Sequence, residues 1–136
     1  MDLFANVALG FSVALTPTNL LFCFLGSLVG TLVGVLPGLG PVGAIAFLLS
    51  LTFKMEPATA IIMVAGIYYG AMYGDSTTSI LVNIRGETAS VVTCLDGYRM
   101  ARQGRAGAAL GISAFGSFIA GTFGVIGLMF LAPMLG

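Results

Sequence analysis

No charged residue occurs between Asp2 and Lys54, and this long neutral stretch constrains the fold more than any other feature of the sequence. A single helix over residues 3–53 would be about 77 Å long at about 1.5 Å per residue, more than twice the roughly 30 Å of a bilayer's hydrocarbon core. The stretch must therefore break at least once. A second neutral run follows Arg105. Together the two runs predict several membrane spans.

The composition of the chain agrees with a membrane protein. Of its 136 residues, 58% are hydrophobic and only 7% are charged, and the mean hydropathy is +1.09. Soluble domains carry about 25% charged residues. We therefore predict an all-α fold, a polytopic transmembrane helical bundle with broken or re-entrant helices, in a single membrane domain over residues 1–136.

The composition also argues against several classes of function. The chain has no histidine, and so no Ser-His-Asp or Cys-His arrangement and no HExxH zinc site. Its only lysine, Lys54, is not in a GxxxxGK[ST] loop for ATP, and Cys23 and Cys94 lack the CxxC spacing of a metal or redox pair. A net charge of zero gives no support to nucleic-acid binding. We expect neither an enzyme nor a metal or cofactor site.

Prolines, glycines and charges divide the chain into segments. Residues 3–15 are too short to span a bilayer and predict an interfacial helix. Residues 20–36 and 42–53 form a broken helix pair, because the prolines and glycines of Pro37-Gly38-Leu39-Gly40-Pro41 cannot continue a regular helix. The remaining predicted segments are a helix with a polar interruption at 58–84, a polar loop at 85–105 and one or two membrane spans at 106–136.

The polar segment 85–105 holds four of the five basic residues, which places it on the cytoplasmic side under the positive-inside rule. The chain stops inside an apolar run, at Leu131-Ala132-Pro133-Met134-Leu135-Gly136, without a charged or polar anchor. We therefore expect a partial chain.

Glycines recur at four-residue intervals in the expected helices. In lipid such a stripe lets another helix backbone approach closely, so the pattern predicts tight helix packing rather than chemistry. The stripes are Gly26, Gly30, Gly34 and Gly38, then Gly66, Gly70 and Gly74, and later Gly107 and Gly111 with Gly116, Ala120 and Gly124.

The break between the first two long helices is the first candidate site. Gly38-Leu39-Gly40-Pro41-Val42-Gly43 matches GxGxxG, but a dinucleotide site needs a preceding strand in a soluble βαβ unit, and here the glycines follow an apolar helix-like run. Glycines and a proline that open a short helix still leave its first amide N–H groups free to face an anion, as in the broken helices of transporters. A plain proline and glycine kink is the alternative.

The second candidate site is the run Asp75-Ser76-Thr77-Thr78-Ser79, with Asn83 beyond it. Small polar residues flanked by apolar helix are hard to place against lipid, which predicts that they line a polar cavity. Hydroxyls and freed carbonyls can bind Na⁺, and hydroxyl donors can hold carboxylates. In the alternative, each hydroxyl bonds a carbonyl one turn back within a helix. Asp75 is a functional candidate, or else a residue at the aqueous end of its helix.

On these motifs the sequence resembles the large membrane subunit of tripartite tricarboxylate transporters, the TctA type. The resemblance covers nearly the whole chain, which corresponds to the N-terminal quarter to third of a family member. The residues that carry it are Gly30 to Pro41, Tyr68-Tyr69-Gly70-Ala71-Met72-Tyr73-Gly74, Ser76-Thr77-Thr78-Ser79-Ile80-Leu81-Val82-Asn83-Ile84, and Leu95-Asp96-Gly97-Tyr98 with Gly104-Arg105-Ala106.

The resemblance implies a multi-pass permease of the bacterial inner membrane, built from inverted repeats of which this chain is part of one. Such permeases work with a small membrane subunit and a periplasmic solute-binding protein, and take up carboxylates such as citrate with an ion gradient. The implied substrate-binding residues are Pro37, Gly38, Leu39, Gly40, Ser76, Thr77, Thr78, Ser79 and Asn83. The candidates for the coupling ion, Na⁺ or H⁺, are Asp75, Ser76 and Thr77. A non-transporting fragment or structural membrane subunit is the alternative.

Two residues depart from the family pattern, which usually has glycine in place of Asp75 and proline in place of Arg85. An acid beside an anion site would repel the substrate by about 4 kcal/mol at about 4 Å and an effective dielectric of about 20, unless Arg85 or a bound cation offsets it. Either the specificity has changed or the gene has decayed, and we expect Asp75 to weaken or alter carboxylate uptake.

Overall fold

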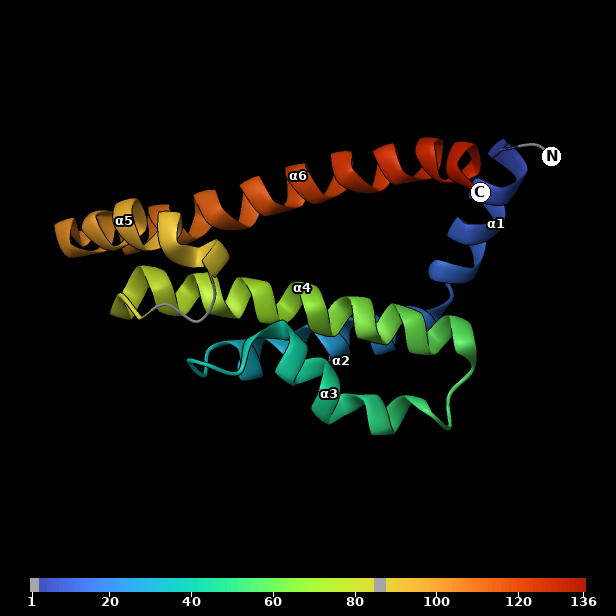
Figure 1. The fold of residues 1–136 in the computed structure, drawn as a ribbon, viewed down its shortest axis with the longest axis horizontal. Helices are drawn as coiled ribbons and strands as arrows, with labels where there is room; N and C mark the ends of the chain where they lie inside the picture. Colours follow the sequence, from blue (N-terminus) through green and yellow to red (C-terminus); the bar gives the residue numbers. More distant parts are fainter. Residues whose placement is uncertain (1–2, 85–87) are drawn as a thin grey trace.

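The computed structural model describes residues 3–84 and 88–136, and every regular element within these ranges is helical. The long helix α4 lies in the middle, with α2 and α3 along one side and α5 and α6 along the other (Figure 1). In chain order the elements are α1 (Leu3–Ala14), α2 (Pro17–Gly34), α3 (Gly40–Thr52), α4 (Pro57–Val82), the short 3₁₀ helix η1 (Thr88–Ser90), α5 (Val91–Met100), the π-helical turn η2 (Ala101–Arg105) and α6 (Ala106–Leu135). The all-α prediction is confirmed for these ranges.

Helices α2 and α4 pack with their backbones in direct contact. A Cβ atom added at any of six buried glycines would lie under 3.0 Å from a backbone carbonyl oxygen of the facing helix. Backbone atoms cannot turn aside as a side chain can, so only glycine fits at these positions. Two of the three glycine stripes predicted from the sequence are therefore each other's partners. They are Gly26, Gly30 and Gly34 on α2, and Gly66, Gly70 and Gly74 on α4. The predicted tight packing is wrong for Gly38 and for Gly107, Gly111, Gly116 and Gly124, whose Cβ positions meet nothing within 4 Å in the described residues.

A buried hydrogen-bond network ties the starts of α2 and α4 together. Thr59 Oγ1 donates to Asn19 Oδ1 at 2.6 Å, and Asn19 Nδ2 donates to the Val13 carbonyl at 2.7 Å and to Thr16 Oγ1 at 3.1 Å. Asn19 is 7% exposed and Thr59 is 6% exposed. Because a buried amide is costly without partners, these bonds fix the register of α2 on α4 at this end.

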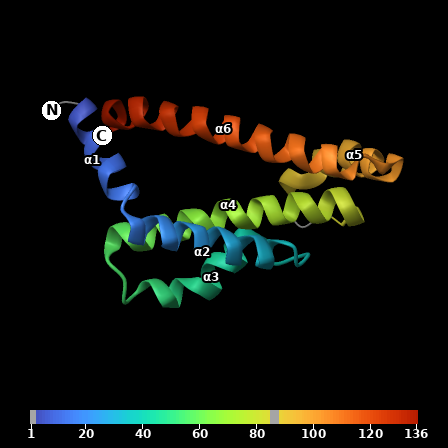
Figure 2. The same cartoon turned by 180° about the vertical axis from the view of Figure 1, so that it is seen from behind.

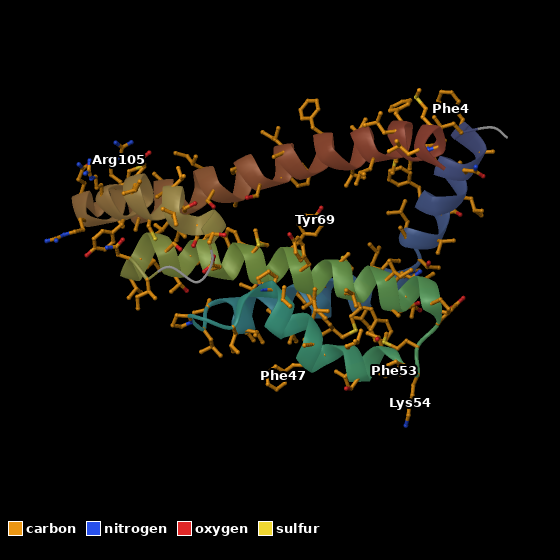
Figure 3. All side chains as sticks on the ribbon, in the orientation of Figure 1. Phe4, Phe47, Phe53, Lys54, Tyr69 and Arg105 are labelled. Carbon is orange, nitrogen blue, oxygen red and sulfur yellow. The ribbon has the colours of Figure 1, made fainter. Side chains whose placement is uncertain are left out.

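Helix α3 contacts α4 near its start and then diverges from it (Figure 2). Gly40, Pro41 and Ala44 are buried, whereas Phe47 and Phe53 are exposed and point away from the other helices (Figure 3). The first turns of α3 are thus held in place by α4, while its later turns leave apolar side chains uncovered.

Helix α6 runs back along α4 with little contact. Ala109 is its buried residue, and Tyr69 of α4 points from α4 toward α6 (Figure 3), where a ring carbon lies 3.7 Å from the Cβ position of Gly121. Among the described residues, two stretches are long and apolar enough to cross a membrane, Pro17–Gly34 and Val91–Leu135, and the second is divided into α5 and α6 by a kink at Gly104. The exposed apolar surface is the one that a bilayer or further transmembrane helices would cover.

Two segment predictions differ from the structure. Helix α4 is unbroken through residues 75–79, where the sequence predicts a polar interruption, and it ends at Asn83 in a left-handed conformation with φ 58°. The segment 85–105, predicted as a polar loop, contains α5. This helix buries Cys94 and Gly97, and its charged residues lie on the exposed side. The amphipathic pattern of α5 is short and is flanked by charged residues, so the helix is hard to predict from the sequence.

We expect Gly70→Ala to lower the free energy of unfolding by about 1–3 kcal/mol, because the new Cβ would meet the Ser27 carbonyl oxygen. The matched control is Gly116→Ala on α6, where a Cβ meets nothing within 4 Å and helix propensity should add up to about 1 kcal/mol. Denaturant titration in detergent micelles measures both. Equal effects of the two substitutions would contradict the direct α2–α4 backbone contact.

Candidate functional site

The two segments singled out in the sequence meet at one end of the unit formed by α2, α3 and α4. Thr78 Oγ1 donates to the Val35 carbonyl at 2.9 Å, and a Cβ on Gly74 would lie 2.9 Å from the Val35 amide nitrogen. Val35 comes directly after α2 and leads into the turn at residues 36–39. The contact between α2 and α4 therefore positions this turn beside the polar part of α4.

The turn delivers the chain into α3 with free amide groups. Gly38 has φ 93° and Gly40 has φ 58°, backbone conformations that favour glycine. The first helical hydrogen bond of α3 runs from the Gly43 amide to the Leu39 carbonyl at 3.2 Å. Within the described residues, the amide N–H groups of Gly38, Gly40 and Val42 donate to no acceptor, and Pro41 has none. Free amides at a helix start carry partial positive charge and suit an anion.

The residues of the turn differ in exposure. Pro37, Gly38 and Leu39 are exposed, whereas Gly40 is buried against α4. The backbone before α3 is thus exposed over Pro37 to Leu39 and buried at Gly40.

The hydroxyls of the polar run bond within their own helix. Ser76 and Thr77 donate to carbonyls one turn back, those of Met72 at 3.1 Å and Tyr73 at 2.9 Å. Thr78 shares its single proton between the Val35 carbonyl at 2.9 Å and the Gly74 carbonyl one turn back at 3.2 Å. The alternative of an intact helix is therefore confirmed, and an unwound segment with freed carbonyls is wrong. The cause is that a hydroxyl can replace a water molecule as partner of a helix carbonyl.

The two remaining polar residues of this segment lie at the end of α4. Ser79 is fully buried and its Oγ lies 3.4 Å from the Ile84 carbonyl oxygen, to which it donates. Asn83 is exposed. Ser79 is thus buried and Asn83 is exposed. The predicted role of both residues in substrate binding stays a prediction.

Asp75 is a buried acid next to the start of α3. Helix α3 runs antiparallel to α4, because α3 starts near Val35 and leads back to the start of α4. Ala71 of α4 packs with Ala44 of α3 in the buried core. One turn further along α4 is Asp75, and one turn earlier in α3 is Gly40, so helix geometry predicts that the two lie near each other.

The surroundings of the Asp75 carboxylate are sparse in partners. Asp75 is 4% exposed, and among residues 3–84 and 88–136 no hydrogen bond or ion pair to it is present. It is not at the aqueous end of α4, which continues to Val82. Arg85, the predicted compensating charge, lies outside the described residues. The burial of this acid agrees with its prediction as a functional candidate, and its role stays a prediction.

Two cavities lie elsewhere in the fold. One of about 440 Å³ is bounded by α1 and the C-terminal part of α6, and its lining is apolar except for Asn6. The other, of about 280 Å³, lies between the end of α4, α5 and α6, and its polar lining is Thr93, Asp96 and Ser113. The sequence predictions missed the second cavity because its residues fall in the segment predicted as a loop.

Exposed apolar helices, a buried acid and a helix start with free amides among the described residues are features typical of a membrane protein. The chain belongs to the tripartite tricarboxylate transporter TctA family, which it matches over residues 20–136. This is a family of membrane transporters and not of enzymes, as the sequence analysis predicts.

One relative shows how the chain relates to a longer protein. It is an Agrobacterium vitis protein described as an uncharacterized 52.8 kDa protein in the TAR-I ttuC' 3' region, and it is 58% identical over 135 residues. The match covers 99% of this chain but 27% of that protein, so the chain spans about a quarter of its relative's length. No solved structure matches the chain.

We expect Thr78→Val to lower the free energy of unfolding by about 1–3 kcal/mol, because it leaves the Val35 carbonyl without its donor and frees the turn before α3. Thr77→Val is the matched control, since its hydroxyl bonds its own helix at the Tyr73 carbonyl. Denaturant titration, with hydrogen exchange of residues 36–43, compares the two. If both substitutions act equally on the turn, Thr78 does not hold it.

Proposed function

We propose that the chain is the N-terminal portion of a permease component of a tripartite secondary transporter, which takes up tricarboxylates or other carboxylates. Membership of the TctA family supports the class of protein. The observation that carries the site is the start of α3, where three amide N–H groups have no acceptor. The transporter lies in the bacterial inner membrane as a multi-pass protein, and an ion gradient drives it.

The proposal includes the partners of a tripartite system. A periplasmic solute-binding protein delivers the carboxylate and a small membrane subunit completes the membrane part, while the bilayer covers the exposed apolar helices. Residues 1–136 form one partial membrane domain within one inverted repeat. The short α3, with 13 residues and a broken connection to α2, is typical of the discontinuous helices at the sites of such transporters.

The hydrogen bonds favour the turn before α3 as the carboxylate site and the polar run of α4 as the cation site. A hydroxyl has one proton and two lone pairs, and the protons of Ser76 and Thr77 are donated to helix carbonyls. Their oxygens can therefore accept or coordinate, but they do not donate to a carboxylate. We assign the carboxylate to the backbone of Pro37, Gly38, Leu39 and Gly40.

The coupling cation, Na⁺ or H⁺, is assigned to the polar run of α4. The Asp75 carboxylate supplies the negative charge and the hydroxyl oxygens of Ser76 and Thr77 lie next to it in sequence. Of the other residues proposed for the substrate site, Thr78 and Ser79 of α4 also donate their protons to carbonyls, so the exposed Asn83 amide at the end of α4 is the donor on this side that we propose for the carboxylate. A cation at Asp75 would also offset the repulsion between this acid and a bound carboxylate.

Asp75 also supports a second candidate function, a non-transporting fragment or structural membrane subunit. A buried acid close to the proposed anion site would repel a ligand carboxylate from the free amides. Gene context separates the two candidates. A downstream reading frame for the missing spans, beside genes for a small membrane subunit and a periplasmic binding protein, supports transport.

We expect Asp75→Gly to change the KM for a carboxylate by about tenfold or more, because about 1.4 kcal/mol of repulsion corresponds to a factor of ten. The host is the Agrobacterium vitis relative with this chain in place of the 135 residues that it matches, reconstituted with its partner subunits in liposomes. Radiolabelled citrate and other carboxylates are assayed with and without a Na⁺ or H⁺ gradient.

Asp75→Glu is the control, since it keeps the charge. It should resemble the unsubstituted chimera more closely than Asp75→Gly does. Unchanged uptake kinetics in Asp75→Gly would contradict a role of this acid at the site. A chimera that moves no carboxylate under any gradient, although it is folded and assembled, would favour the non-transporting alternative.

A further inference from the structure

The cavity of about 280 Å³ between α4, α5 and α6 is separate from the proposed carboxylate site. Its polar side chains are Thr93 and Asp96 from α5 and Ser113 from α6. Apolar residues form the remaining walls, among them the buried Ile80 of α4 and Ala109 of α6. One exposed carboxylate and two half-buried hydroxyls thus line one mostly apolar cavity.

The packing of α5 on α4 and α6 builds this cavity. A Cβ on Gly97 would lie 2.7 Å from Cγ1 of Ile80, so this glycine lets α5 approach the end of α4 closely. Thr93 and Asp96 are three residues apart and share a face of α5. Gly104, with φ 77°, lies where the chain reverses, and α6 then returns alongside α5 and brings Ser113 to the cavity (Figures 1 and 2).

The two hydroxyls in the cavity differ from most others in these helices. Ser76, Thr77 and Thr122 each donate to a carbonyl one turn back. Thr93 and Ser113 are half-buried, yet within residues 3–84 and 88–136 neither hydroxyl makes a hydrogen bond. Because no fully buried side-chain polar atom in those ranges lacks a partner, both hydroxyl oxygens have accessible surface, and both residues line the cavity. Each can therefore offer its oxygen to a ligand.

The chemistry of the lining selects a hard cation. Carboxylate and hydroxyl oxygens are the ligands that such cations prefer, and no basic side chain is among the described residues that line the cavity. Arg99, one turn after Asp96 on α5, is exposed and outside the lining. Since one water molecule takes about 30 Å³ in the liquid, the volume accommodates an ion that keeps several waters.

We propose that this cavity binds Na⁺ through the Asp96 carboxylate and the hydroxyl oxygens of Thr93 and Ser113, as a cation site separate from Asp75. The site gives a role to Leu95-Asp96-Gly97-Tyr98, a motif that the carboxylate site does not use. A bound ion joins α5 to α6 and holds both against the end of α4. Binding itself is independent of transport; only a coupling role of this ion rests on the proposed function.

Equilibrium binding of radioactive sodium to the purified full chain in lipid nanodiscs tests the site, with choline chloride keeping the ionic strength constant. We expect Asp96→Asn to weaken Na⁺ binding by about tenfold or more, because it removes the charge, and Ser113→Ala and Thr93→Val to weaken it by a smaller factor. Thr122→Val is the matched control on α6, since its hydroxyl bonds the Phe118 carbonyl. Asp75→Asn measures the other proposed cation position.

Unchanged Na⁺ affinity in Asp96→Asn, or a loss confined to Asp75→Asn, would overturn the proposal. If Asp96→Asn does not fold, as judged by helical circular dichroism, Ser113→Ala decides, because it removes one oxygen from an accessible position without breaking a hydrogen bond. Citrate uptake by the chimera separates the two claims. Intact uptake without Asp96-dependent binding rejects this cation site alone, whereas Asp96-dependent binding without uptake rejects the transport function alone.

Discussion

The contact between the backbones of α2 and α4 is the constraint on which the rest of the structure depends. The six glycines of this contact each face a carbonyl oxygen of the other helix, so neither helix can shift without a collision. The Asn19–Thr59 hydrogen bond fixes the register at one end, and the bond from Thr78 to Val35 fixes it at the other. The turn before α3 therefore has a defined place beside the polar part of α4, and the candidate site follows from helix packing.

At the candidate site, the available hydrogen-bond donors lie at the start of α3 and the available acceptors lie on α4. The start of α3 presents amide donors without acceptors, while the hydroxyls of Ser76 and Thr77 have already donated their protons to α4. In the proposed function, the carboxylate therefore binds the amide donors, and the cation binds the Asp75 carboxylate and the hydroxyl oxygens of α4.

Sequence patterns predict the parts of this fold that depend on local chemistry. Pro17 and Pro57 lie in the first turns of α2 and α4, and the glycine stripes predict the close helix contact. The polar run at 75–79 could not be assigned locally, because hydroxyl groups suit an unwound segment and an intact helix equally. The burial of Asp75 depends on the register of α3 against α4, and α5 depends on the fit of Gly97 against Ile80. Both are tertiary contacts that no short pattern records.

Hydrogen exchange at the start of α3 tests the central claim most directly. Amides without acceptors exchange quickly unless a ligand covers them. In the full-length chimera, the account predicts that citrate with Na⁺ slows exchange in residues 38–42, while Na⁺ with chloride does not, and that the exposed turns of α6 are unaffected. Fast exchange in residues 38–42 at saturating citrate, or protection that appears only elsewhere in the chain, would contradict the assignment of the carboxylate to this helix start.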